Sequence, residues 1–200
     1  MEHTVICLSR QFGSGGREIG RRLAERLGIA FYDRELIELA AERGDIQISR
    51  LEKADERRTN PWLFKSLYEG NGTVERGASP NDTLFWLQSK VIREIARMED
   101  CLFVGRCAAH VLSRAGISHK SLFICAPWEE RVRQVSAREQ IDERSAAQLI
   151  RRMDKQRRVY TEYYTGGRWG DAESYDLCVS SARLGLEKTV DLLAGYCVQP

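Results

Sequence analysis

The stretch that decides the fold is SRQFGSGGREIG, at residues 9–20. It comes directly after TVICL at residues 4–8, a short apolar run rich in β-branched side chains that predicts a buried strand. Apolar residues then recur every four positions from Ile19 to Leu27, which predicts a helix that Gly28 ends. The chain is therefore expected to open with a strand, a glycine-rich loop and a helix.

The glycines of this segment suit it to binding phosphate. Gly13, Gly15 and Gly16 permit backbone conformations that other residues avoid, so successive N–H groups can point at one anion. The following helix N-terminus adds partial positive charge, and Arg17 adds a guanidinium. A tight turn without a ligand is the alternative, but such a turn does not need three glycines in four positions. The residues expected to hold the phosphates are Gly13, Ser14, Gly15, Gly16, Arg17 and Glu18.

The segment departs from the GxxxxGK[ST] pattern of phosphate-binding loops. In that register, Arg10 stands at the first glycine, Gly16 at the lysine and Arg17 at the Ser/Thr that binds Mg²⁺. Arg17 is the candidate replacement for the lost cation. Ser14 is a poor substitute for the lost metal ligand, so the sequence leaves the Mg²⁺ ligands unknown.

Strands and helices alternate through the rest of the chain. Apolar runs of the kind found in strands lie at residues 29–32, 102–104, 121–125 and 175–179. Helical patterns lie at residues 34–43, 83–99, 108–115, 142–164 and 186–196, and a further one begins at residue 127. This alternation predicts an α/β fold, with a central parallel sheet of about five strands and helices on both faces.

Composition narrows the class of protein. The 200 residues are 42% hydrophobic and 30% charged, which predicts one globular domain. The net charge of +2 argues against a nucleic-acid binder. The six cysteines form no CxxC pair and no zinc spacing, which favours reduced thiols. We see no signal peptide and no apolar run of membrane-spanning length, so we expect a cytoplasmic protein with no membrane partner.

Several motifs resemble the cytidylate kinase-like family, relatives of bacterial cytidylate kinase among the nucleoside monophosphate kinases. The opening motif is residues 9–20 together with LAERLG and FYDRELI, which follow it. The similarity continues in FVGRCA (103–108), LFICAPWEERVRQV (122–135), DKQRRVYTEYYTG (154–166) and YDLCVSSARLGLEK (175–188). It covers nearly the whole chain and is weak between residues 45 and 82.

The resemblance implies a three-layer P-loop fold in a single domain. The core would comprise residues 1–44 and 83–200, with a helical acceptor-binding insertion at 45–82 and an arginine-rich lid at 142–168. The cofactors it implies are ATP and Mg²⁺. Its partners would be a nucleotide and a small-molecule acceptor.

The resemblance also implies roles for individual residues. Asp33 would lie near the acceptor nucleotide, and Arg106 would grip the acceptor's phosphate or base. Arg151, Lys155 and Arg158 would act with Arg17 as catalytic cations. These three recur at i, i+4 and i+7 and so share one helical face, which suits the charge neutralisation that phosphoryl transfer needs. A solvated charged face is the alternative for such a run.

The expected activity is transfer of the γ-phosphoryl group of ATP to a small acceptor, by default CMP or dCMP. Two alternatives stay open. The lost lysine and hydroxyl of the loop fit a nucleotide-binding regulatory protein without turnover. The stretch 108–110 (AAH), where family members often carry an acidic residue, fits a kinase of a non-nucleotide metabolite. The sequence also leaves open whether the protein is a homo-oligomer.

Overall fold

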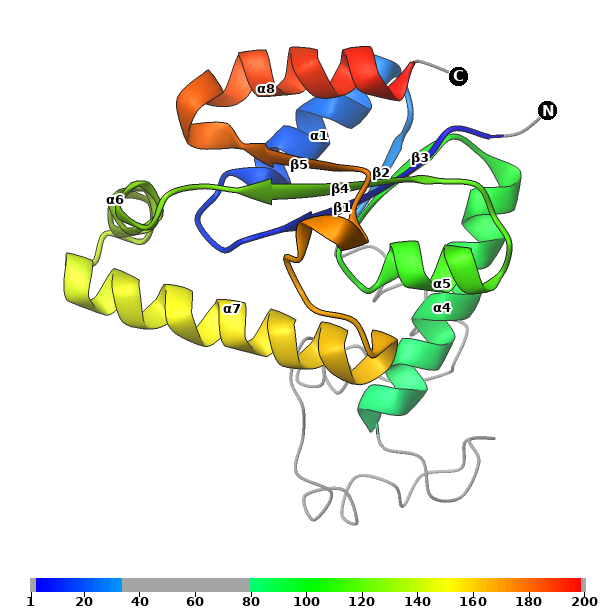
Figure 1. Cartoon of the computed structure of the whole chain (residues 1–200), viewed down its shortest axis with the longest axis horizontal. Coiled ribbons are helices and arrows are strands. Elements are labelled where there is room, and N and C mark those ends of the chain that lie inside the picture. Colours follow the sequence, from blue (N-terminus) through cyan, green and yellow to red (C-terminus); the bar gives the residue numbers. More distant parts are fainter. Residues whose placement is uncertain (1–2, 34–79, 199–200) are drawn as a thin grey trace.

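The computed structural model describes residues 3–33 and 80–198. In these residues a five-stranded parallel sheet has helices on both faces (Figure 1), which confirms the α/β fold expected from the sequence. The strand order is β2-β3-β1-β4-β5. The strands are β1 (Val5–Arg10), β2 (Ala30–Tyr32), β3 (Cys101–Val104), β4 (Lys120–Cys125) and β5 (Leu177–Ser180).

Six α-helices complete the described part of the fold. They are α1 (Gly16–Leu27), α4 (Pro80–Met98), α5 (Ala108–Arg114), α6 (Trp128–Glu139), α7 (Glu143–Thr165) and α8 (Ser181–Cys197). A short 3₁₀ turn, Ala172–Ser174, precedes β5. The helix expected at residues 34–43, and the expected insertion up to residue 79, lie outside the described residues.

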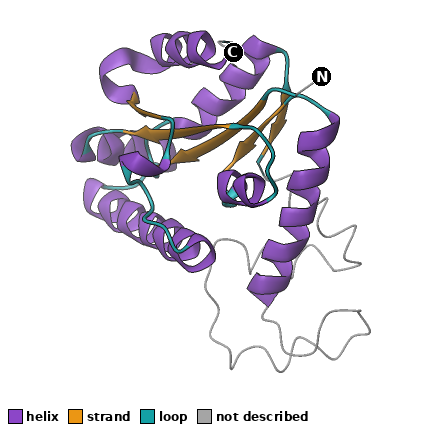
Figure 2. Ribbon diagram, turned by 45° about the vertical axis from the view of Figure 1, so that its right-hand side comes forward, coloured by secondary structure: helices purple, strands orange, loops and turns teal. Residues whose placement is uncertain are grey.

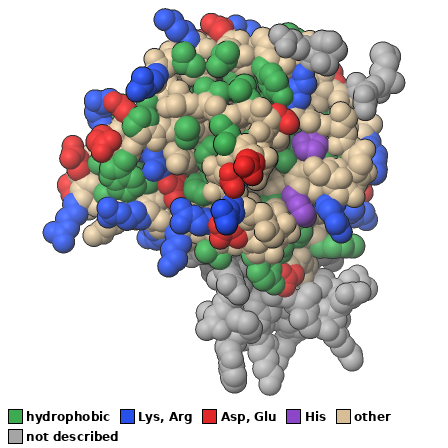
Figure 3. Space-filling view, in the orientation of Figure 1, with side chains coloured by type: hydrophobic (Ala, Val, Ile, Leu, Met, Phe, Trp, Pro, Cys, Tyr) green, Lys and Arg blue, Asp and Glu red, His purple; other side chains and the backbone are tan. Residues whose placement is uncertain are grey.

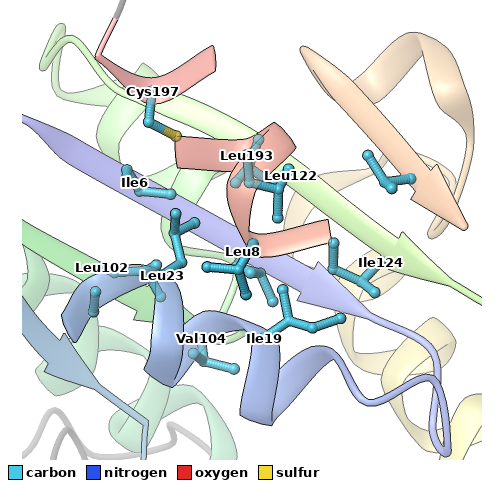
Figure 4. Packing of buried hydrophobic residues seen from close by; sticks show 13 residues of the cluster. Ile6, Leu8, Ile19, Leu23, Leu102, Val104, Leu122, Ile124, Leu193 and Cys197 are labelled. Carbon is cyan, nitrogen blue, oxygen red and sulfur yellow. The ribbon is translucent and has the colours of Figure 1, made fainter. Parts of the chain in front are cut away.

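The sheet is covered differently on its two faces (Figures 1 and 2). Helices α1 and α8 pack on one face, where Ile6 and Leu8 of β1 meet Ile19, Leu23 and other buried side chains (Figure 4). The alternate residues of β1 point to the other face and pack with α4 and α5. Each strand of a buried parallel sheet is apolar on both sides, which is why the continuous apolar runs of the sequence mark the strands.

All five strands are parallel, so their carboxyl ends lie along one edge of the sheet. The loop at residues 11–15 follows β1, Asp33 follows β2, Gly105 follows β3 and Ala126 follows β4. Open α/β sheets bind their ligands at this edge. The topology therefore brings together segments that are about a hundred residues apart in the sequence.

Two helix ends show how local sequence sets the element boundaries. Gly28 ends α1 in the left-handed conformation (φ 68°), as its position in the sequence predicts. Helix α8 begins at Ser181, earlier than the expected residue 186, because a kink at Gly185 (φ 74°) separates its first turn from the rest. That extra first turn brings the Ser181 hydroxyl to the backbone of the loop after β1.

Candidate active site

The glycine-rich loop after β1 is tightly held by its surroundings. Gly13 and Gly15 both have left-handed backbones (φ 80° and 73°). A Cβ atom on Gly13 would lie 2.9 Å from Cγ2 of Val135, so the loop rests directly against α6. Ser14 is buried; its hydroxyl donates to the Gln11 carbonyl at 2.9 Å and accepts from the Gly16 N–H at 3.3 Å. The hydroxyl thus braces the loop.

The start of α1 offers backbone donors for an anion. Its N-cap, Gly15, contributes no side-chain hydrogen bond, and the first N–H groups of a helix have no acceptor within the helix. The first N–H to reach back within α1 is that of Ile19, which donates to the Gly15 carbonyl at 3.0 Å. The N–H groups of Arg17 and Glu18, together with the positive end of the helix dipole, are therefore suited to bind a phosphate.

A cavity of about 750 Å³ opens in front of this loop. Its walls come from the loop, the start of α1, the residues after β2 and β3, and the facing parts of α6 and α7. Among the described residues, six arginines line it against three carboxylates, so its potential is positive and attracts polyanions. The arginines are Arg10, Arg17, Arg21, Arg106, Arg138 and Arg157; the carboxylates are Glu18, Asp33 and Glu139.

Arg17 and Asp33, both expected at the site, form an ion pair across the cavity. Nε of Arg17 lies 2.5 Å from Oδ2 of Asp33, and Nη2 of Arg10 lies 3.8 Å from Oδ1. Asp33 is buried (4% exposed), whereas the Arg17 side chain is 64% exposed. Asp33 therefore anchors two arginines, one buried and one largely exposed to solvent.

Glu18 lies at the cavity rim and faces its own helix. Its carboxylate accepts hydrogen bonds from Arg21 at 2.8 Å and from Arg22 at 2.7 Å. These two bonds, that from Arg21 foremost, lower the pKa of Glu18 to about 2. Glu18 thus orients two arginines of α1 close to the phosphate loop.

Arg106 sits on an unusual turn at the end of β3. Gly105, Arg106 and Cys107 are three successive residues in the left-handed region, with φ of 76°, 56° and 53°. Such a conformation costs about 1–2 kcal/mol for a residue with a side chain, and residues held this way cluster at functional sites. The turn directs Arg106, only 6% exposed, into the cavity. Burial lowers the pKa of its guanidinium to about 10.

Helix α7 is connected to the glycine-rich loop by buried polar contacts. Asp154 accepts a hydrogen bond from the Phe12 N–H at 2.8 Å and pairs with Nη1 of Arg131 at 2.5 Å. The same Arg131 atom donates to the Phe12 carbonyl at 3.2 Å. Arg157 donates to the Arg10 carbonyl at 3.1 Å. The loop is therefore clamped between α6 and α7.

The three lid cations expected from the sequence do not line this cavity. Arg151, Lys155 and Arg158 are exposed, and the Arg151 guanidinium stacks 5.0 Å from the centre of the Trp128 ring. Helix α7 instead turns Met153, Gln156 and Arg157 to the cavity. The reason is packing: the buried side of α7 contains Ala146, Ile150, Asp154 and Tyr160, and the expected cations lie one position further round the helix.

A smaller cavity, of about 280 Å³, lies between the sheet, α5 and the end of α7. Three arginines, Arg10, Arg106 and Arg157, line both cavities and so form the wall between them. The rest of the smaller cavity is mostly polar or aromatic and includes His110, Tyr160 and Tyr175. Of the tyrosines in the lid motif, Tyr160 alone lines it. Arg106, although buried, thus borders both cavities.

The described residues do not fit a magnesium site of the usual phosphate-loop type. Arg17 occupies the position of the Ser/Thr ligand, and the Ser14 hydroxyl is used within the loop. Within residues 3–33 and 80–198 there is also no cluster of three His, Cys, Asp or Glu that could hold a metal ion. The same part of the chain contains no helix both long and apolar enough to span a membrane.

The structure adds site residues that the sequence analysis did not single out. Asp154, Arg131 and Arg157 hold the loop from α6 and α7. Ser181, in the first turn of α8, donates its hydroxyl to the Ser14 carbonyl at 2.6 Å. These four residues lie within the motifs that resemble the family, but the sequence gives no other sign of their role. Each contacts a residue about 120–170 positions away, and no local pattern predicts such a contact.

The surface around the site is rich in charge of both signs. Figure 3 shows basic side chains gathered at the lower left, where α6 and α7 lie in Figure 1, with acidic side chains among them. Several form ion pairs: Arg133 pairs with Glu130 on the surface, and Arg138 pairs with Glu139 at the cavity. Charges of both signs on this face therefore offset one another in part.

Comparison with known proteins assigns the chain to a family. Residues 5–183 match the cytidylate kinase-like family. A search of the curated proteins finds no match. A solved structure of an uncharacterized protein from Eubacterium ventriosum is 26% identical, with a TM-score of 0.72 over 99% of this chain and 100% of that one.

Two more distant structures share the fold. Shikimate kinase from Bacteroides thetaiotaomicron is 16% identical, with a TM-score of 0.54 over 96% of this chain and 97% of that one. A tunicamycin resistance protein from Deinococcus radiodurans is 14% identical, with a TM-score of 0.55 over 99% and 97%. At these identities the two structures show a shared fold and nothing finer. Because the family match spans most of the chain and includes both the phosphate loop and the Arg106 turn, the protein belongs to the cytidylate kinase-like family.

Proposed function

We propose that this protein transfers the γ-phosphoryl group of ATP to a small acceptor, with CMP or dCMP as the default acceptor. The observation that carries the proposal is the cavity of about 750 Å³ that joins the glycine loop, Asp33 and Arg106 at one edge of the sheet. A phosphoryl donor and an acceptor need such a shared, positively charged space. Family membership supports a nucleotide-dependent phosphotransferase and leaves the acceptor open.

The donor phosphates would bind at the loop and the start of α1. Backbone N–H groups there would hold them, with Arg17 at the open side of the cavity. Arg17 is paired with Asp33 in this structure, and it is exposed enough to turn to a phosphate. We propose that donor binding draws Arg17 from Asp33 to the triphosphate. Gly13, Ser14, Gly15, Gly16 and Glu18 would shape this end of the site.

The acceptor would be anchored by Arg106. Its guanidinium is buried and held by a turn of three left-handed residues, and the cost of burying it is offset when it binds an anion. Asp33, at the end of the neighbouring strand β2, would complete the acceptor side. An anionic acceptor of modest size, such as a nucleoside monophosphate, fits this chemistry.

The reaction would be an in-line displacement at phosphorus. An acceptor oxygen forms a bond to the γ-phosphorus while the bond from that phosphorus to the β,γ-bridging oxygen breaks, and the bonding electrons leave with ADP. A phosphate dianion as acceptor carries no proton on the attacking oxygen, so no general base is required. The protein would supply alignment and positive charge, chiefly from arginine.

Arg157 is the α7 cation placed to contribute that charge. It lines the cavity, whereas Arg151, Lys155 and Arg158 point away from it. A catalytic role for these three stays a prediction, and it requires α7 to rotate or move. Comparing Arg157→Ala with Lys155→Ala separates the two arrangements, because only the variant that removes an active cation lowers kcat.

A regulatory protein that binds nucleotide without turnover is the second candidate. The observation that favours it is the Arg17–Asp33 pair, which occupies both the candidate cation and the acidic residue of the acceptor side. In this case ATP would raise the unfolding temperature without any release of ADP. A kinase of a non-nucleotide metabolite is distinguished from both by turnover with a metabolite panel and none with nucleotides.

The test is release of ADP from Mg-ATP in a coupled assay with CMP, dCMP, UMP, AMP and GMP. We expect turnover with a pyrimidine nucleotide, and its loss in Arg17→Ala. Arg133→Ala is the matched control, because Arg133 is exposed on α6 and pairs with Glu130 away from the cavity. Absence of turnover with every nucleotide and every metabolite acceptor would contradict the proposal.

A further inference from the structure

Positions 10 and 16 of the chain exchange the residue types that a phosphate-binding loop usually has. The usual pattern has glycine first and lysine seventh, and this chain has Arg10 first and Gly16 seventh. The structure gives a steric reason for the pairing. A Cβ atom on Gly16 would lie 2.6 Å from Cβ and 3.2 Å from Cγ of Arg10, so the two positions cannot both carry a side chain unless the backbone shifts.

The side chain of Arg10 fills the space in which the usual lysine would begin. From the end of β1 it passes Gly16 and reaches Gly105 at the end of β3, where Nη1 would overlap a Cβ atom. Its Nη2 lies 3.8 Å from Oδ1 of Asp33. The side chain is 10% exposed and lines the cavity together with Gly13, Gly15 and Gly16. It therefore lies between the phosphate loop and the acceptor side.

We infer that Arg10 supplies the cation that the lysine of a standard phosphate loop provides, delivered from β1 instead of from α1. This inference rests on the proposed function, because it assigns the role within the donor-phosphate site. Position 16 is glycine because the Arg10 stem occupies its side-chain space. A guanidinium suits the role, since its planar fork can contact two phosphate oxygens at once.

Arg10 is better fixed for this role than Arg17. The Arg17 side chain is 64% exposed and that of Arg10 is 10% exposed. The ion pair with Asp33 and the close packing beside Gly105 restrict the Arg10 guanidinium before any ligand arrives, so less conformational entropy is lost on binding. Arg17 then acts as a second, mobile cation.

The exchange can be reversed by mutation. Arg10→Gly with Gly16→Lys, the reversed double variant, restores the usual pattern and removes the steric conflict. Arg10→Ala with Gly16→Lys is the control double variant, because an alanine at position 10 keeps the Cβ atom that lies 2.6 Å from the new one. Ile124 also lies close to a Cβ at position 16, at 3.1 Å, and must shift by a few tenths of an ångström in both double variants.

The experiment measures affinity for Mg-ATP and for tripolyphosphate by titration calorimetry, with folding checked by circular dichroism. Removing a charged hydrogen-bonding partner typically costs about a factor of ten or more in affinity. We expect Arg10→Ala to weaken the binding of both ligands by about this factor, and Arg10→Lys to bind them more tightly than Arg10→Ala does, because lysine keeps the charge. The reversed double variant should bind more tightly than either of its single variants, and the control double variant should not. Arg133→Ala should bind as the wild type does.

The inference is overturned if folded Arg10→Ala binds tripolyphosphate as tightly as the wild type. It is also overturned if the reversed double variant, though folded, binds no better than Arg10→Gly. If the double variants fail to fold, the comparison of Arg10→Ala with Arg10→Lys is sufficient to test the inference. Tripolyphosphate binding needs no acceptor, so a wild type that binds it but turns over no acceptor refutes the proposed activity and leaves this test valid. A wild type that binds neither ligand contradicts both.

Discussion

The burial of Arg106 lowers the stability of the folded protein but suits this residue to binding an anion. Its guanidinium is 6% exposed, and burial lowers its pKa to about 10, so the folded protein holds a charge that water would solvate better. The backbone at Arg106 and Cys107 is also left-handed (φ 56° and 53°). An anion bound to Arg106 would offset the cost of burying its charge, while the strained turn would keep the guanidinium in place.

Arg106→Met therefore should separate stability from function. Because burial outweighs the attraction of Tyr160 and Asp33 in setting the pKa of Arg106, replacing its charge by an apolar side chain of similar length is expected not to lower the free energy of unfolding, while acceptor turnover is lost. Chemical denaturation and the ADP-release assay measure the two effects. A variant that is clearly less stable than the wild type would mean that Arg106 mainly braces the fold.

Glu18 gives a prediction about pH. Its pKa in the folded protein is about 2, below the ordinary value of 4.5, so its contribution to stability is full above the ordinary value and is lost as the pH falls through this interval. We expect Glu18→Gln to lower the unfolding temperature at neutral pH, and the difference from wild type to narrow in acid. The effect should be small and should weaken in salt, because the pairs are exposed. A difference that is independent of pH would exclude the ion pairs as its cause.

Individual residues were predictable where the residue type alone decides the conformation. Glycines 13, 15 and 28 are left-handed in the structure, as their positions in the loop and at the helix end indicate. The path of Arg10 was not predictable, because it depends on Gly16 and on Gly105, which is ninety-five positions away. A sequence pattern identifies the residue types of a site but cannot give the direction of a long side chain.

Helix α7 shows the corresponding limit at the scale of an element. Its position was predicted well, at residues 142–164 against Glu143–Thr165 in the structure. The orientation of α7 about its axis was predicted wrongly. The spacing of charged residues identifies a polar face, but α7 has polar residues on two faces. One face carries the exposed cations, and the other carries Asp154 and Arg157, whose polar groups contact the phosphate loop. A buried polar face has no distinct hydrophobic signature.

Asp154→Asn tests whether α7 supports the phosphate loop. The substitution leaves the buried Arg131 guanidinium without its carboxylate, and breaking a buried pair in this way typically costs about 3–5 kcal/mol. Asp154 also accepts a hydrogen bond from the Phe12 N–H in the loop. We therefore expect the folded fraction of Asp154→Asn to bind Mg-ATP more weakly than the wild type does. Calorimetry below the unfolding temperature measures it.

The control for this variant is Arg152→Ala, two positions earlier on α7 and exposed. It should change neither stability nor nucleotide affinity by more than a small amount, since surface substitutions are usually near neutral. If Asp154→Asn destabilises the protein but binds Mg-ATP as the wild type does, the contacts of Asp154 with Phe12 and Arg131 stabilise the fold without shaping the loop for its ligand.

At the scale of the whole molecule, alternating apolar runs were sufficient to predict the fold. All five strands lie within a few residues of the predicted runs, and the sheet is parallel with helices on both faces (Figure 2). The strand order β2-β3-β1-β4-β5 was not predicted, because neighbours in a parallel sheet are chosen by packing between distant segments. That order places the loop after β1 between Gly105 after β3 and Ala126 after β4, and so assembles the cavity.

The central claim is that the glycine-rich loop binds the phosphates of a nucleotide. The most direct measurement is a titration of isotope-labelled protein with Mg-ATP, followed by NMR of the backbone amides. The account predicts the largest shifts at Gly13, Gly15, Gly16 and Arg17, and their reduction in Arg10→Ala. Shifts confined to another part of the protein, or none at saturating Mg-ATP, would contradict it.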